Sequence, residues 1–204
     1  MARFLSFKNN RHFNLVYRSM RSQSILFICC AAVMLLLSGF TLTHRTKSFS
    51  KTKLAHSSGA LRIVIDKDQY ELKVYDETGW LMTYPVVFGT SEKDDKMMEG
   101  DRRTPEGHFK IVAKKIHKEW GPFLLLDYPT KESLEKFNER KQSGLIPPYA
   151  KPGGGIGIHA TRINEDRYVD FFYNWTQGCI STKREYAREL YEMLPVGTEV
   201  EILK

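Results

Sequence analysis

The sequence predicts a mostly-β domain with two or three helices, preceded by an apolar segment long enough to cross a membrane. Short stretches in which apolar and polar residues alternate recur between residues 60 and 204, and turn residues separate them. In the same part of the chain, residues 131–141 and 183–194 are typical of helices. Residues 25–42 form a run of eighteen residues without a charge, which is about the length of a membrane-spanning helix.

The charge of the chain is unevenly divided. Residues 1–59 contain nine Lys and Arg and no Asp or Glu, whereas residues 60–204 contain 22 Lys and Arg against 24 Asp and Glu. The net charge of +7 therefore belongs to the N-terminal segment. Because those basic residues flank an apolar run, we expect a membrane as their partner rather than nucleic acid.

We expect four parts in the chain. They are a basic cytoplasmic leader (1–24), a transmembrane anchor or signal-peptide core (25–43), a flexible linker rich in Ser, Thr and Lys (44–59) and a folded domain (60–204). The long leader and the poor cleavage site at Leu37-Ser38-Gly39 favour an uncleaved anchor. A translation start at Met20 would instead give an ordinary signal peptide. Both alternatives place the domain outside the cytoplasm.

The first half of the domain reads as strands joined by turns. Residues 61–65, 70–75 and 81–88 predict an antiparallel meander, because short turns separate them. The charged stretch 89–103 predicts an exposed loop. Two further strands are expected at residues 109–116 and 123–127.

The second half of the domain mixes helices and strands. Residues 131–141 predict a helix with Leu134 and Phe137 on its apolar side, ended by Gly144 and the prolines that follow it. This helix and its loop form a lid or wall of a substrate cleft, or alternatively a surface excursion. A strand ending at His159 follows, and residues 199–203 predict the final strand.

A single cysteine and a histidine form the candidate active site. Cys179 has no partner in its domain, since Cys29 and Cys30 both lie in the apolar segment. Thr182 and Glu185 have the spacing of a capping box that opens helix 183–194. Cys179 would then lie just before a helix N-terminus, where the helix dipole favours a thiolate. The alternative is a buried structural cysteine.

The motifs around these two residues resemble those of a known family. His159-Ala160 and, fifteen residues later, Thr176-Gln177-Gly178-Cys179 are similar to the His-Gly and Ser/Thr-His-Gly-Cys signature of the L,D-transpeptidases of the YkuD family. Residues 104–109 match the family's Thr-Pro-x-Gly-x-Phe turn, and Phe88-Gly89 stands where its second strand ends. The resemblance covers residues 60–204 and implies a β-sandwich-like catalytic domain.

The resemblance also implies a role for each residue of the site. Cys179 is the nucleophile, His159 the general base, and the Ala160 carbonyl orients the imidazole. Gln177 replaces a family histidine and its amide can still donate to an oxyanion. The other expected oxyanion donors are the N–H groups of Gly178 and Cys179. Thr176 and Ser181 are the remaining expected contacts, and Ser181 stands where the family carries Asn or Arg. No cofactor and no metal ion are expected.

The expected function is acyl transfer on peptidoglycan stem peptides through a cysteine thioester, which forms L,D-crosslinks. Two alternatives stay open. One is hydrolysis, as a carboxypeptidase, an endopeptidase or a hydrolase of a protein-peptidoglycan linkage. The other is an inactive, membrane-tethered wall-binding module, which the replacement of the family histidine by Gln177 would indicate. We expect a single-pass membrane protein with its catalytic domain outside the cytoplasm, or a secreted domain after signal cleavage.

Overall fold

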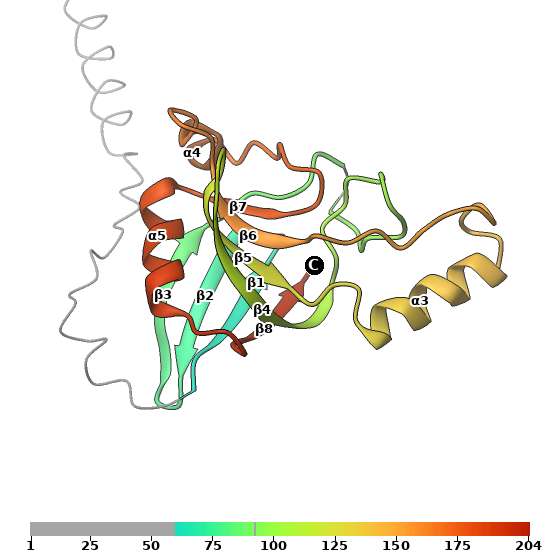
Figure 1. Ribbon diagram of the computed structural model, residues 1–204, viewed down its shortest axis with the longest axis horizontal. Helices are drawn as coiled ribbons and strands as arrows, with labels where there is room; N and C mark the ends of the chain where they lie inside the picture. Colours follow the sequence, from blue (N-terminus) through green and yellow to red (C-terminus); the bar gives the residue numbers. More distant parts are fainter. Residues whose placement is uncertain (1–59, 92) are drawn as a thin grey trace, which may run out of the picture. The chain divides into compact units, whose positions relative to one another are not determined.

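The computed structural model describes residues 60–91 and 93–204 (Figure 1). Within them the chain forms an eight-stranded sheet. The elements are β1 (Arg62–Asp66), β2 (Glu71–Asp76), β3 (Gly79–Pro85), β4 (Gly107–His117), β5 (Gly121–Leu126), α3 (Lys131–Gln142), β6 (Gly157–Ala160), α4 (Arg167–Asp170), β7 (Ile180–Thr182), α5 (Arg184–Met193) and β8 (Glu199–Leu203). The predicted leader, apolar segment and linker lie outside the described residues. Among the described residues, no helix has the length and apolar character to cross a membrane.

The strands follow the order β3-β2-β1-β8-β4-β5-β6-β7. The predicted antiparallel meander of β1, β2 and β3 is confirmed. The β8 strand lies between β1, to which it is parallel, and β4, to which it is antiparallel. The expected sandwich is corrected in one respect. The two halves of the sheet are continuous, because the eleven residues of β4 pair with β8 at one end and with β5 at the other.

The two ends of the sheet are brought together beyond β3. Val87 and Ser181 exchange both backbone hydrogen bonds, each at 2.8 Å. The segment after β3 therefore pairs with β7, the strand at the opposite end of the sheet order. The β7 strand therefore has a backbone partner on both sides, β6 on one side and Val87 on the other.

The core lies on the inner face of this coiled sheet. Alternate residues of β1, β2 and β8 are at most 1% exposed: Ile63, Ile65, Leu72, Val74, Val200 and Ile202. Each fully buried aliphatic side chain contributes roughly 1.5–3 kcal/mol. The α5 helix covers β5 and β6 with Ala187 and Leu190, and Figure 1 shows it lying against the strands. The α5 helix thus packs on the two strands next to the candidate site, and one of them, β6, carries His159.

The α3 helix begins and ends where the sequence predicts. Thr130 caps it, since its hydroxyl accepts the N–H of Ser133, and Gly144 follows its end with a φ of +73°. Its apolar side is narrower than expected, because Phe137 is buried while Leu134 is 38% exposed. In Figure 1 the helix lies apart from the strands.

The predicted capping box before α5 is wrong. Thr182 belongs to β7, and its hydroxyl donates to the Pro85 carbonyl at 2.7 Å. The N-cap is Lys183, which makes no side-chain capping bond. Cys179 is separated from the helix by the whole of β7, and the field of a helix terminus falls off within about one turn.

Candidate active site

Two parallel strands bring the candidate nucleophile and base to one face of the sheet. The register of β6 and β7 pairs Ile158 with Ile180 and His159 with Ser181. Side chains paired in this way point to the same face, and residues two apart on a strand share that face. Cys179 directly precedes β7 and is two residues from Ser181. The pairing that the motif spacing implied between Cys179 and His159 therefore has a structural basis.

The His159 imidazole is buried and oriented. It is 2% exposed, and its Nδ1 lies 2.7 Å from the Ala160 carbonyl oxygen. A carbonyl can only accept, so Nδ1 carries the proton and Nε2 of the neutral ring is left with a free lone pair. Burial lowers the pKa of His159 to about 4. Ala160 in place of glycine is compatible with this arrangement, because its φ is not positive.

The Cys179 thiol is half-buried and has a weak hydrogen bond. Its Sγ lies 3.6 Å from the carbonyl oxygen of Gly155. Burial raises the pKa of Cys179, and the nearby Lys96 ammonium only partly opposes this effect. The expectation of a thiolate favoured by a helix terminus is therefore wrong. Both groups favour their neutral forms at rest, a thiol and an imidazole.

The turn before Cys179 requires glycine. Gly178 has a φ of +130°, and a Cβ there would lie 2.7 Å from the carbonyl oxygen of Arg103. Gly89 is equally confined, since its Cβ would lie 2.0 Å from the Arg102 carbonyl oxygen. The Gly89 N–H donates to the Thr104 hydroxyl at 3.1 Å. The motif that begins at Thr104 thus packs directly behind the cysteine turn.

Thr176 has a different position from the one expected. It is 3% exposed, so its side chain does not face a substrate. Its hydroxyl accepts the Gly178 N–H at 3.1 Å and donates to the Cys179 carbonyl at 2.7 Å. The Gly178 N–H, which we expected at the oxyanion, is therefore already engaged. Thr176 shapes the turn instead of contacting the substrate.

Gln177 and Ser181 differ in exposure. The side chain of Gln177 is exposed next to the cysteine, as a substrate-facing residue must be. Ser181 is 0% exposed, and its Oγ has no hydrogen-bond partner in the described part of the chain. The expected substrate contact of Ser181 stays a prediction, and its hydroxyl is as buried as the His159 imidazole on the neighbouring strand.

The loop between β3 and β4 is not the exposed loop that its charge predicted. Lys96 is 5% exposed and pairs with Asp101 at 2.6 Å. The Asp101 carboxylate also accepts the backbone N–H groups of Met97, Met98 and Arg103. Arg140 of α3 holds the loop from the other side, through its ion pair with Asp95 at 2.6 Å and a bond to the Lys96 carbonyl. The α3 helix thus braces a wall of the cysteine site, which supports the wall interpretation over a surface excursion.

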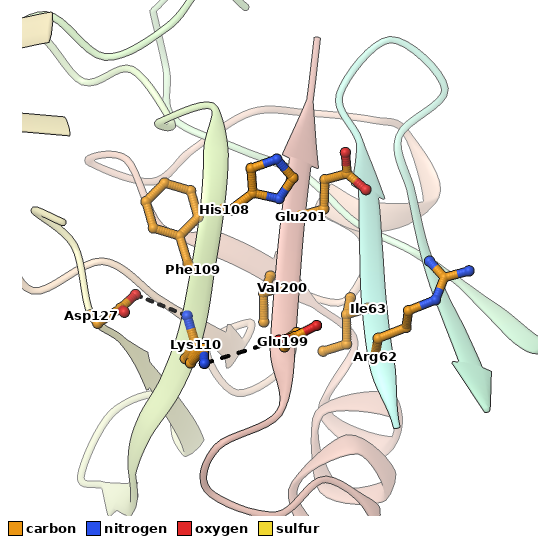
Figure 2. Close-up of a pocket in the computed structure, with 9 residues that line it drawn as sticks. All are labelled: Arg62, Ile63, His108, Phe109, Lys110, Asp127, Glu199, Val200 and Glu201. Atoms are coloured by element: carbon orange, nitrogen blue, oxygen red, sulfur yellow. Dashed lines mark hydrogen bonds and ion pairs between the residues drawn. The ribbon is translucent and has the colours of Figure 1, made fainter. Parts of the chain in front are cut away.

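A cavity of about 400 Å³ lies away from this site, across β1, β8 and β4 (Figure 2). Its charged residues lie on neighbouring strands, and Lys110 approaches Glu199 at 4.0 Å. Neither Cys179 nor His159 lines it, so we do not place the chemistry there. The full lining is Arg62, Ile63, His108, Phe109, Lys110, Asp127, Glu199, Val200 and Glu201. No group of three potential metal ligands occurs among the described residues.

The described part of the chain is a mostly-β domain in which the free Cys179 directly precedes β7 and the buried His159 on β6 is bound to the Ala160 carbonyl. The family comparison is more specific. The sequence profile of the L,D-transpeptidase catalytic domain, YkuD, matches residues 60–202. The chain therefore belongs to the L,D-transpeptidase family, as the motifs indicated. The comparison with curated proteins gave no significant match.

Among the solved structures, Pgp2 supports the same fold, and two others are weaker matches. The helical cell shape determining protein Pgp2 from Campylobacter jejuni is similar at 21% identity with a TM-score of 0.53, over 72% of this chain and 48% of that one. Bd1075 from Bdellovibrio bacteriovorus matches at 20% identity with a TM-score of 0.49, over 71% and 48%. An L,D-transpeptidase from Mycobacterium smegmatis matches at 19% identity with a TM-score of 0.43, over 72% and 59%. This chain thus spans about half to three fifths of the length of those chains.

Proposed function

We propose that this protein transfers acyl groups between peptidoglycan stem peptides through a thioester on Cys179. The observation that carries the proposal is the in-register pairing of β6 and β7. That pairing supports a position for the half-buried thiol on the same face as the buried His159, whose Nδ1 is bound to the Ala160 carbonyl. The family to which the chain belongs supports the reaction class.

The first step begins from the neutral pair. The Cys179 sulfur attacks the carbonyl carbon of the peptide bond before the terminal D-alanine, while the thiol proton passes to Nε2 of His159. The tetrahedral intermediate then collapses, the C–N bond breaks, and His159 returns the proton to the departing amine. The products are a thioester and free D-alanine. A histidine of lowered pKa gives up its proton readily in this second half.

The second step reverses the first with another nucleophile. The side-chain amine of a neighbouring stem attacks the thioester carbonyl and gives its proton to His159. The C–S bond breaks, an amide forms, and the proton returns to the Cys179 sulfur. If water takes the place of the amine, the same site hydrolyses the stem, so the acceptor alone separates a crosslinking enzyme from a carboxypeptidase.

The oxyanion in both steps needs hydrogen-bond donors. The Gly178 N–H is held by Thr176, so we assign the donors as the Cys179 N–H and the exposed amide of Gln177. Each donor of this kind contributes roughly 3 kcal/mol to the transition state. The replacement of a family histidine by Gln177 is therefore compatible with catalysis.

We also propose that the catalytic domain works outside the cytoplasm, tethered by residues 25–43. The uncharged run and its basic flank support a single span, and the stem peptides of the wall lie on that side. Accessibility of Cys179 to a thiol reagent that cannot cross the membrane tests this location in intact cells. Labelling only after lysis would contradict it.

The experiment that tests the activity uses the full-length chain and its Cys179→Ala variant. Purified disaccharide tetrapeptides are added, and mass spectrometry follows both the protein and the stems. A thioester adduct on the wild type, with loss of D-alanine and formation of linked stems, supports the proposal. Loss of D-alanine without linked stems would assign hydrolysis. A wild type that forms no adduct and leaves the stems intact would show an inactive wall-binding module.

A further inference from the structure

Aromatic rings gather around the proposed base, and Trp120 and Phe123 also contact each other, with centroids 6.4 Å apart. His117 stacks on Trp120 with centroids 4.2 Å apart and planes 14° from parallel. Trp120 stacks on His159 at 4.9 Å and 26°. Phe123 also stacks on His159, at 5.7 Å and only 3° from parallel. Trp175 meets the same imidazole edge-on at 5.6 Å and 84°. The His159 ring is thus enclosed by flat aromatic neighbours.

The turn that carries Trp120 is itself fixed. It joins β4 to β5, and His117 is the last residue of β4. Nδ1 of His117 accepts the N–H of Glu119 at 3.2 Å and that of Trp120 at 3.4 Å. Gly121 follows with a φ of +61°, and a Cβ there would lie 3.1 Å from a guanidinium nitrogen of Arg184. Trp120 is therefore held over His159 by local hydrogen bonds and by the start of α5.

We propose that Trp120 is a positioning residue for the reaction, which holds the His159 ring in the plane where Nδ1 donates to Ala160 and closes that ring off from water. The proposal rests on the proposed function only in taking His159 as the base. The ring contacts explain how the imidazole is held, because rotation about χ2 would drive it into the indole of Trp120 or into Phe123. The Nδ1 tautomer and the direction of Nε2 are fixed in consequence.

Opposing effects act on the proton affinity of this ring. A cation over an aromatic face gains roughly 0.5–2 kcal/mol, which favours imidazolium. Loss of water favours the neutral ring, and it is the dominant cause that lowers the pKa of His159 to about 4. The hydrogen bond of Nδ1 to the Ala160 carbonyl also favours imidazolium, and burial outweighs it. Removing the indole would admit water to one face and weaken the dominant effect.

The charged and titratable groups near these aromatic rings do not form ion pairs with His159. His117 lies beyond Trp120 and lowers the pKa of His159 slightly further. The other groups contact neighbouring rings, backbone or each other, and Arg162 also pairs with Glu165 at 3.9 Å. They are Lys115 over Phe123, Arg162 over Trp175, Tyr168 beside Trp175, Arg184 on the Thr161 carbonyl, and Cys179 on the same face. A change in the titration of His159 on removal of Trp120 thus reports water access rather than a broken ion pair.

The test is an NMR titration of the His159 ring nitrogens in the full-length chain. The variants are Trp120→Ala, Trp120→Leu and Trp120→Phe, with Trp80→Phe as the control, since Trp80 is a half-exposed tryptophan on β3 that bonds Thr83. In the wild type and the control we expect the Nδ1–H tautomer and a midpoint well below that of a free histidine. In Trp120→Ala the midpoint rises by about one pH unit or more, and both tautomers appear.

Trp120→Phe keeps a flat ring and is expected to shift the midpoint less than Trp120→Leu, which covers the site without a plane. These two variants decide the question if Trp120→Ala does not fold. Folded Ala and Leu variants whose His159 midpoint and tautomer equal those of the wild type would overturn the proposal. The acid limb of thioester formation should move to higher pH in step with the midpoint. A wild type that forms no thioester would overturn the proposed function, while the titration would still decide the role of Trp120.

Discussion

The hydroxyl of Thr176 accepts the N–H of Gly178 at 3.1 Å and, as a donor, binds the Cys179 carbonyl at 2.7 Å. One buried side chain thus fixes both sides of the turn that presents the nucleophile. Without it, a buried N–H and a carbonyl would lose their partner, which costs roughly 1–3 kcal/mol for each group.

Thr176→Val is therefore expected to lower the free energy of unfolding by about 2 kcal/mol and to slow thioester formation. Thr176→Ser keeps the hydroxyl and should restore most of both properties. Urea unfolding and single-turnover acylation of the three proteins measure the effect. A valine variant as stable and as fast as the wild type would show that the turn holds itself.

Cys179→Ala should abolish thioester formation while the chain stays folded, because the hydrogen bonds of the thiol to backbone groups are weak. The family resemblance adds a probe, since carbapenems acylate the cysteine of these enzymes. Mass spectrometry should find a carbapenem adduct on the wild type and none on the variant. An adduct of equal yield on Cys179→Ala would mean that another residue is the nucleophile.

Gln177→Ala should slow acylation about a hundredfold, since a lost oxyanion donor costs roughly 3 kcal/mol. The structure strengthens this expectation, because the Gly178 N–H is engaged elsewhere. Stability should barely change, as the side chain is exposed. Gln177→His should keep or raise the rate and add a pH dependence near that of imidazole. Single-turnover acylation across pH compares the three proteins, and an unchanged rate in Gln177→Ala would leave the oxyanion to main-chain donors alone.

His159 should make stability depend on pH. Its pKa is about 4 in the folded chain and about 6.5 when unfolded, so the unfolded chain binds more protons between these values. The free energy of unfolding therefore falls as pH falls from about 6.5 to about 4. Between about pH 7 and pH 4.5, the wild type should lose roughly 2 kcal/mol more than His159→Gln does. Urea unfolding at both pH values measures this difference, and equal losses would mean that His159 is hydrated in the folded chain.

Residues 60–204 should fold without residues 1–59. The core named above is built entirely from strands and helices of this part, and the family profile begins at residue 60. The truncated chain should unfold cooperatively on heating, with a midpoint close to that of the full-length chain. An aggregated product, or one without a cooperative transition, would show that the domain needs part of the preceding segment.

Local patterns in the sequence were enough to predict the longer strands and helices, while the catalytic pair stays a prediction. Alternation predicted β2 within one residue at each end, and β8 at both ends. The spacing of the His159 and Cys179 motifs predicted neighbouring positions that the register of β6 and β7 supports, and Gly178 has the backbone conformation expected of a sharp turn.

The features that the sequence did not predict depend on contacts between distant segments. The three residues of β7 and the four of α4 are too short to show a period, and β7 exists because β6 and Val87 pair with it. The Thr182 hydroxyl reached Pro85 instead of capping a helix, a choice that local spacing cannot reveal. Burial of Lys96 and the stacking of Trp120 on His159 likewise require the folded arrangement; the only local sign was an aromatic residue at a hairpin turn.

The place of β8 has a consequence for synthesis. This strand is the eighth along the chain, yet it lies between β1 and β4 and joins the two halves of the sheet. While the chain leaves the ribosome, β1 therefore waits for a neighbour that is 137 residues away along the sequence, as the pairing of Arg62 with Glu199 shows. A product that stops before residue 199 would carry two open strand edges and the complete cysteine motif, but no continuous sheet.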